Sequence, residues 1–197
     1  MNAILALCAL SAKRKLKYAL YLCALALLAL LLHPVDALTI RVASSIPPAP
    51  RADGESPLLF AASAPLGQEF ATEYIHSVQL TPVQDIYRVV NGRIWPWQER
   101  AQSHNAGLPF AQPPCGRFRM DAPWMVFEGG RRSLDRIFLR VGSAELGRNV
   151  FFYGKETTRT ALYEIFPGQR LQLSVERRPS LTLLFQARRF PEIQNRQ

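Results

Sequence analysis

The chain has 197 residues, of which 48% are hydrophobic and 20% are charged, and its formal net charge is +9. These values allow one folded domain of ordinary size behind a leader segment, and they exclude a chain that is disordered throughout. Four of the 24 basic and one of the 15 acidic residues lie in the first 37 positions, which leaves a net charge near +6 for the rest. Because the remaining arginines are scattered and accompany no nucleic-acid motif, we expect no nucleic-acid binding.

The N-terminal segment is typical of a protein exported from the cytoplasm. Basic residues at positions 13–17 precede an uninterrupted apolar run over residues 18–32. At ~1.5 Å per residue this run spans about 22 Å, which is shorter than the ~30 Å hydrocarbon core of a bilayer. Val35 and Ala37 are small residues at the two positions preferred before a signal-peptidase cut. Residues 1–37 are therefore a signal peptide or an N-terminal membrane anchor.

Cleavage after Ala37 and an uncleaved anchor in the inner membrane both remain open. In either case the basic residues stay in the cytoplasm, so we expect the rest of the chain in the periplasm or at the periplasmic face of the inner membrane. Beyond the leader, Cys115 is the only cysteine. No internal disulfide can form there, and we interpret Cys115 as a small packing residue.

Beyond the leader, short apolar runs with strand periodicity alternate with Gly, Pro, Asn and Asp, and no run has a sustained helical period. Residues 98–122 are rich in Gly, Pro, Asn and Gln and are expected to form one long irregular loop. The runs expected to form strands are residues 38–42, 58–61, 70–77, 83–90, 93–95, 124–127, 136–141, 150–153, 162–166, 170–175 and 181–185. This spacing predicts an all-β fold, a single β-sandwich or partly open barrel of short antiparallel strands. The exported domain would occupy residues 38–178, with a C-terminal strand and tail at 179–197.

Two polar segments contain both histidines that follow the leader, one in the hairpin at 70–90 and one at 103–109. Pro82 is expected to mark the turn of the hairpin. A turn near Leu80 would place His76 opposite Asp85, whose carboxylate could fix the tautomer of the imidazole. We therefore predict that one candidate binding site gathers these polar side chains: His76, Ser77, Thr81, Asp85, Arg88, Ser103, His104 and Asn105.

Catalytic and metal-binding interpretations of this cluster are weak. His76 and Asp85 with Ser77 or Ser103 supply the residue types of a hydrolytic triad, but no serine lies in a Gly-x-Ser-x-Gly elbow. The two histidines with Asp85 or Glu99 could hold a metal, yet no closely spaced His or Cys pair supports such a site. We expect no catalytic residue, metal or cofactor, and we favour a role for the histidines in pinning loops to the sheet.

Two further sets of residues have both binding and structural interpretations. Arg88, Arg93 and Arg117, together with the histidines, could line a cleft for a carboxylate, because the planar guanidinium pairs with it through two hydrogen bonds. The alternative is that these arginines are solvated on strand faces. Trp95 and Trp97 could form a binding platform, although packing of the loop is the more ordinary role.

Several blocks of this sequence resemble the bacterial domain-of-unknown-function family numbered eighteen-fifty. The resemblance extends from about residue 38 to about residue 175. The blocks that carry it are residues 74–78, 81–88, 103–109, 116–118, 124, 129–132, 139–142 and 166–171.

Members of that family are small exported or membrane-anchored proteins, typically encoded beside TRAP solute transporters of the class whose receptor is called TAXI. The resemblance implies a non-enzymatic envelope protein that is accessory to such a transporter, contacting its membrane subunit or its TAXI solute receptor. It assigns no catalytic residue. Two other functions remain open: a periplasmic module that itself binds a small organic anion, and a hydrolase that depends on His76.

Overall fold

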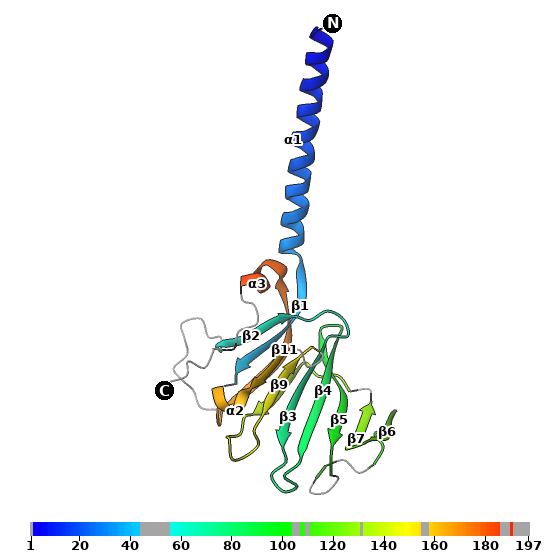
Figure 1. Ribbon diagram of the computed structural model, residues 1–197, viewed down its shortest axis with the longest axis vertical. Coiled ribbons are helices and arrows are strands. Elements are labelled where there is room, and N and C mark those ends of the chain that lie inside the picture. The colour runs from blue at the N-terminus through cyan, green and yellow to red at the C-terminus, as the bar shows by residue number, and fades with distance from the viewer. Residues whose placement is uncertain are drawn as a thin grey trace.

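The structure is a computed structural model that describes residues 2–43, 56–103, 107–108, 111–130, 132–154, 158–185 and 190. Within these residues, one long N-terminal helix leads into eleven strands that form two antiparallel sheets (Figure 1). The sheets do not close into a barrel. The predicted all-β, sandwich-like fold is confirmed.

The two sheets differ in size. The smaller has four strands in the order β2 (Leu58–Ser63), β1 (Pro34–Val42), β11 (Arg170–Pro179) and β8 (Arg136–Arg140). The larger has seven strands in the order β10 (Thr158–Ala161), β9 (Val150–Tyr153), β3 (Glu69–Ile75), β4 (Pro82–Val90), β5 (Arg93–Ala101), β7 (Trp124–Gly129) and β6 (Gly116–Asp121).

The hydrophobic core lies between the sheets and draws on both. Alternate residues of each strand point inward, as the period of two requires. Phe60 contributes from the smaller sheet and packs edge-on against Phe151 of the larger one, with ring centroids 5.4 Å apart. Phe70 stacks on Tyr87 at 5.0 Å on the inner face of β3 and β4. Fully buried aliphatic residues complete this core: Leu38, Ile40, Val89, Ile94, Val141, Leu162, Leu171 and Leu173.

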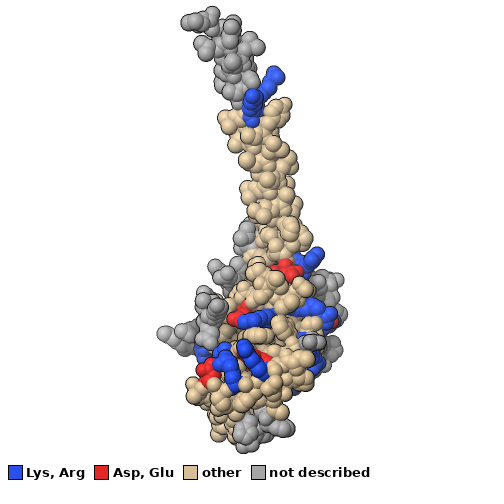
Figure 2. All heavy atoms as spheres, turned by 90° about the vertical axis from the view of Figure 1, so that its right-hand side faces the viewer, with Lys and Arg blue, Asp and Glu red and all other residues tan. Residues whose placement is uncertain are grey.

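Helix α1 (Asn2–Leu32) extends away from the β domain (Figure 1). The segment of α1 over residues 14–32, 19 residues long, has a mean hydropathy of 1.9 and is nowhere buried. At ~1.5 Å per residue it is about 28 Å long, so by length and composition it is long and apolar enough to cross a ~30 Å hydrocarbon core, a test that a signal sequence also passes. Figure 2 shows basic side chains only toward the far end of the described helix, and the part nearer the domain is uncharged.

Strand β1 follows α1 directly and begins at Pro34, before the expected start at residue 38. Its first residues are integral to the smaller sheet, because Ala37 pairs with Glu176 on one side and Ser63 on the other. The Ala37 side chain is fully buried. The Asp36 carbonyl accepts a hydrogen bond of 2.7 Å from the Ala64 N–H.

Several expected elements differ from the structure. The strand predicted at 162–166 is a short helix, α2 (Leu162–Ile165), and the strand predicted at 181–185 is α3 (Ser180–Phe185). Both runs are apolar, and periodicity alone does not separate a buried strand from a buried helical turn in so short a segment. The loop expected at 98–122 is interrupted by the end of β5 and by β6, and β10 was not predicted.

Candidate functional site

The hairpin of β3 and β4 has a different register from the one the sequence predicted. Ile75 pairs with Pro82, and Thr72 lies opposite Asp85. His76 instead faces Thr81, whose carbonyl accepts a hydrogen bond of 2.9 Å from the His76 N–H. The predicted contact between His76 and Asp85 is therefore wrong. The turn closes nearer to β3 than Pro82 suggested, which moves the partner of Asp85 along β3.

His76 organises the turn that joins β3 to β4. Its Nδ1 accepts hydrogen bonds of 3.2 Å from the N–H groups of Val78 and Gln79. The His76 carbonyl also accepts one of 2.8 Å from Leu80, which has a left-handed φ of 54°. An imidazole nitrogen that accepts two N–H groups is unprotonated, so the neutral ring carries its proton on Nε2. His76 thus pins a loop to the sheet.

Only part of the predicted polar cluster gathers at this turn. The Ser103 hydroxyl donates a hydrogen bond of 2.9 Å to the Gln79 side chain, which joins the end of β5 to the turn. Ser77 is exposed, and the buried Thr81 hydroxyl has no hydrogen-bond partner among the described residues. His104 and Asn105 lie outside the described residues.

Asp85 lies on the inner face of the larger sheet, directly opposite Glu99 on β5. Neither carboxylate has an ion-pair or hydrogen-bond partner in the described part of the chain. Burial raises the pKa of Asp85 to about 6. Burial, with a further contribution from the negative charge of Asp85, raises the pKa of Glu99 to about 7. Burial and the same two carboxylates raise the pKa of Tyr74 to about 12.

The carboxyl pair borders a pocket of about 280 Å³ between β5, β7 and the start of β8. Tyr87, Trp97 and Phe127 supply aromatic lining, and Ile137 lines the side that faces the smaller sheet. Within the described chain, no three His, Cys, Asp or Glu side chains are grouped closely enough to hold a metal ion. The pair can bind and release a proton near neutral pH, because its two carboxyls ionise there.

The three arginines proposed as an anion cleft do not form one. Each of the three pairs with its own carboxylate. The Nη2 of Arg88 donates to Glu69 Oε1 at 2.6 Å, and the Nη2 of Arg93 lies 3.2 Å from Asp135 Oδ1. Arg117 pairs with Glu128. A guanidinium that already pairs with a carboxylate attracts a second anion weakly.

The tryptophans on β5 pack at the surface. Trp95 donates from its indole N–H to the Gly130 carbonyl at 3.1 Å, and its ring lies 5.1 Å from that of Trp97. The guanidinium of Arg88 lies 4.2 Å from the centre of the Trp97 ring. Cys115 is exposed, so its interpretation as a packing residue is wrong.

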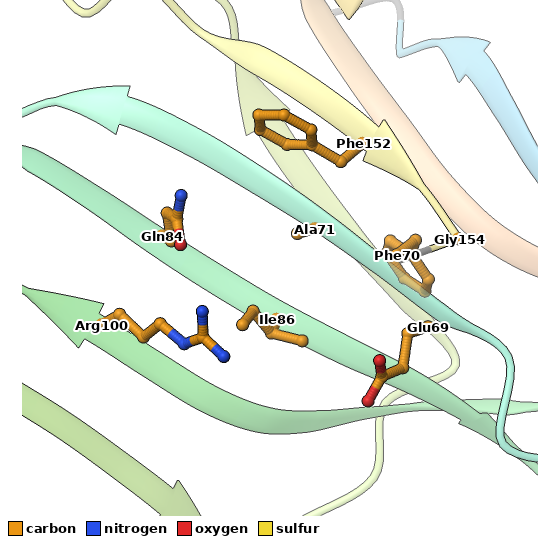
Figure 3. A pocket seen from close by; sticks show the side chains of 8 residues that line it. All are labelled: Glu69, Phe70, Ala71, Gln84, Ile86, Arg100, Phe152 and Gly154. Carbon is orange, nitrogen blue, oxygen red and sulfur yellow. The ribbon is translucent and has the colours of Figure 1, made fainter. Parts of the chain in front are cut away.

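A second pocket, of about 360 Å³, lies on the outer face of the larger sheet. Figure 3 shows Phe152, Ala71 and Ile86 along its floor, with Arg100 at one side and Glu69 at another. Sequence reasoning missed Arg100, because nothing in its local sequence separates it from other arginines on strand faces. The alternation of β4 and β5 contained a usable signal, since it places Arg100 on the same face as Gln84 and Ile86.

Residues 70–158 match the family model described as domain of unknown function (DUF1850). The matched region of the chain resembles that family. The match begins in β3 and ends at the start of β10, so it includes the His76 turn, the carboxyl pair and all the residues that line the pocket at Arg100 except Glu69. Comparison with curated proteins and with solved structures found no match.

Proposed function

We propose that the chain is a non-enzymatic envelope protein, held at the periplasmic face of the inner membrane by α1 and accessory to a TRAP transporter of the TAXI class. The observation that carries this proposal is the direct continuation of α1 into β1. Residues 34–37 form part of β1, which lies inside the smaller sheet, and a cut after Ala37 would remove them. The fold is therefore more complete with the anchor retained, which supports an uncleaved α1. The resemblance to the DUF1850 family supports the transporter context.

The packing around the start of β1 supports retention. Ala37 forms a small buried cluster with Ala61 and Leu183. The Ser180 N–H and hydroxyl donate to the His33 carbonyl at 3.1 and 3.0 Å, which ties α3 to the junction of helix and strand. Cleavage after Ala37 would break these contacts and leave β11 without its partner over residues 176–179.

Orientation follows from the charges that flank the helix. Arg14, Lys15 and Lys17 lie at the end of the apolar segment away from the β domain, and basic residues beside a membrane span stay in the cytoplasm. The β domain is then periplasmic. A phosphatase reporter fused after Gln197 is expected to be active, and a reporter that works only in the cytoplasm is expected to be silent.

The state of His76 supports a non-enzymatic role. A general base needs a free lone pair on one ring nitrogen, and the turn amides occupy the lone pair on Nδ1. The protonated Nε2 cannot accept a proton. The predicted orienting carboxylate, Asp85, lies opposite Thr72 instead.

Partner recovery tests the transporter role. The tagged full-length chain would be solubilised from membranes in mild detergent, and proteins recovered with it would be identified by mass spectrometry. We expect the membrane subunit of a TRAP transporter or its TAXI receptor. A variant in which another apolar helix replaces α1 keeps the β domain at the membrane and is the matched control. Recovery of no transporter component with either form would contradict the proposal.

A further inference from the structure

We propose that the outer face of the larger sheet binds a small organic monocarboxylate, with Arg100 pairing with the carboxylate and the floor formed by Ala71, Ile86 and Phe152 receiving its apolar body. This site is independent of the transporter role, because binding to the purified chain and recovery of a partner are measured separately.

Within the described residues, no carboxylate pairs directly with Arg100 to neutralise its charge. Its Nε and Nη2 donate hydrogen bonds of 3.1 and 3.0 Å to the amide oxygen of Gln98. Among the described residues no acidic side chain pairs with it, and its Nη1 has no partner there. A guanidinium has five N–H donors, so Arg100 retains donors for an incoming carboxylate.

Two neighbouring side chains, Gln98 and Glu128, hold Arg100 in position. Gln98 donates from its amide nitrogen to the carboxylate of Glu128 at 2.6 Å, which orients the amide oxygen toward Arg100. Glu128 is 3% exposed and is held by Arg117 as well. Burial raises the pKa of Glu128, but the hydrogen bonds from Arg117 and Gln98 outweigh burial and lower it overall. Glu128 therefore stays ionised and keeps Gln98 in place. Gln98 in turn holds the Nε and Nη2 of Arg100, which leaves Nη1, among the described residues, free to bind a ligand.

The neighbouring arginines on this face are in a different state. Arg88 pairs with Glu69 and stacks on Trp97, Arg117 pairs with Glu128, and Arg119 lies 2.6 Å from Asp121. Each of these cations already faces a carboxylate. Arg100 is held by a neutral amide instead, so an external anion meets a positive charge at this position.

The hollow beside Arg100 has a simple cause in the register. Ala71 pairs with Phe152 on one side and with Ile86 on the other, and all three share the outer face. Figure 3 shows Ala71 between Phe152 and Ile86, and a methyl group between two larger side chains leaves a depression. Its volume of about 360 Å³ is at the lower end of the range of about 300–1,000 Å³ seen for ligand pockets.

These features select the chemistry of the ligand. One unpaired planar cation suits one carboxylate, which matches its fork through two hydrogen bonds. Glu73 accepts a hydrogen bond of 2.7 Å from the neutral amide of Gln84, and no cation pairs with it among the described residues. A second negative charge on the ligand would therefore be repelled on that side. The aromatic ring of Phe152 and the branched Ile86 favour an aromatic or branched apolar body over a polar one.

The test uses the full-length chain in lipid nanodiscs and para-fluorophenylacetate as the probe. Fluorine NMR line broadening measures binding, and empty nanodiscs correct for partition into lipid. We expect a Kd of about 1 mM or below for the wild type. The uncharged para-fluorophenylacetamide is expected to bind at least about tenfold more weakly, because it cannot form the ion pair.

Three variants locate the site. Arg100→Gln is expected to weaken binding by about tenfold or more, and Ala71→Leu is expected to abolish it by filling the hollow while the charge remains. Arg93→Gln removes the same charge from the other end of β5, outside the pocket, and is expected to leave binding unchanged. The circular dichroism spectrum of each variant must match that of the wild type. If Arg100→Gln does not fold, Arg100→Lys takes its place. We expect Arg100→Lys to bind the probe more weakly than the wild type, because Lys lacks the planar guanidinium that pairs with a carboxylate through two hydrogen bonds.

The proposal is overturned if the acid and the amide bind equally well, or if folded Arg100→Gln and Ala71→Leu both bind the probe as the wild type does. It is also overturned if the wild type shows no binding at a probe concentration of about 10 mM, since an affinity weaker than that is below what a built site supplies.

Discussion

Asp85 on β4 and Glu99 on β5 lie directly opposite each other in an antiparallel pair, on the inner face of the larger sheet. Like charges in this arrangement repel, and burial adds the cost of removing both carboxylates from water. A proton on one or both carboxyls reduces this cost. The pair therefore links the stability of the sandwich to pH.

We predict that stability falls as this pair ionises. Both pKa values are raised in the folded state, from 3.8 to about 6 for Asp85 and from 4.5 to about 7 for Glu99. The folded chain then binds these protons more tightly than the unfolded chain does. The contribution of the protonated carboxyls to the free energy of unfolding is therefore complete below about pH 4, and it is lost as pH rises through about 6 and 7. Asp85→Asn should be more stabilising near pH 8 than near pH 5, by roughly 1–2 kcal/mol after allowance for solvent screening.

Urea denaturation of wild type and variant across this pH range measures the difference. Asp121→Asn is the matched control, because it removes one carboxylate from an exposed site on β6 that lies opposite Trp124 and not opposite a second carboxylate. A difference between Asp85→Asn and wild type that stays constant with pH would contradict the prediction.

His76→Ala should destabilise the fold. It removes the acceptor for the N–H groups of Val78 and Gln79, each of which would then rely on solvent. We expect a loss of roughly 1–2 kcal/mol in the free energy of unfolding. Ser77→Ala, at an exposed neighbouring position, should have almost no effect. Unchanged stability of His76→Ala, together with a loss of partner recovery, would show instead that His76 is a binding residue.

Leu80→Gly should stabilise the same turn. Leu80 has a left-handed φ of 54° and is 74% exposed, so its side chain gains little from packing. Glycine adopts this conformation without the steric cost of roughly 1–2 kcal/mol paid by other residues. A rise in melting temperature is expected. Leu66→Gly is the control, because Leu66 is similarly exposed but has no positive φ, and there the change should be neutral or destabilising. A lower melting temperature for Leu80→Gly would contradict this account.

The sequence predicted the faces of the strands more securely than their partners. The period of two in the run at 70–77 puts Phe70, Thr72 and Tyr74 on one face of β3, and Phe70 and Thr72 are buried there. The pairing of His76 with Asp85 failed, because the residues that close the turn are not determined by the strand pattern. A shift of the turn by two positions keeps every residue on its face and still changes every partner. Thr72, on the same face as the predicted partner, therefore occupies the place opposite Asp85.

The candidate sites depend on long-range contacts that no local pattern encodes. Glu99 follows shortly after Asp85 in the chain, but its direct opposition to Asp85 depends on a bulge in β5 near Pro96. Arg100 resembles the other arginines of the larger sheet until its partner is known to be Gln98 and not a carboxylate. The strand residues at 34–37 were missed for a similar reason, since small residues before Ala37 suit both a cleavage site and a crowded sheet.

The intact mass of the protein purified from membranes tests the central claim, that α1 remains attached and holds the β domain at the membrane. The account predicts a membrane-bound species that retains residues 1–37 and therefore has the full mass of 22.2 kDa. Replacement of Ala37 by the larger Leu, which is unsuited to signal-peptidase cleavage, should leave that N-terminus intact. A soluble periplasmic species that begins at Leu38 in the wild type would contradict the claim.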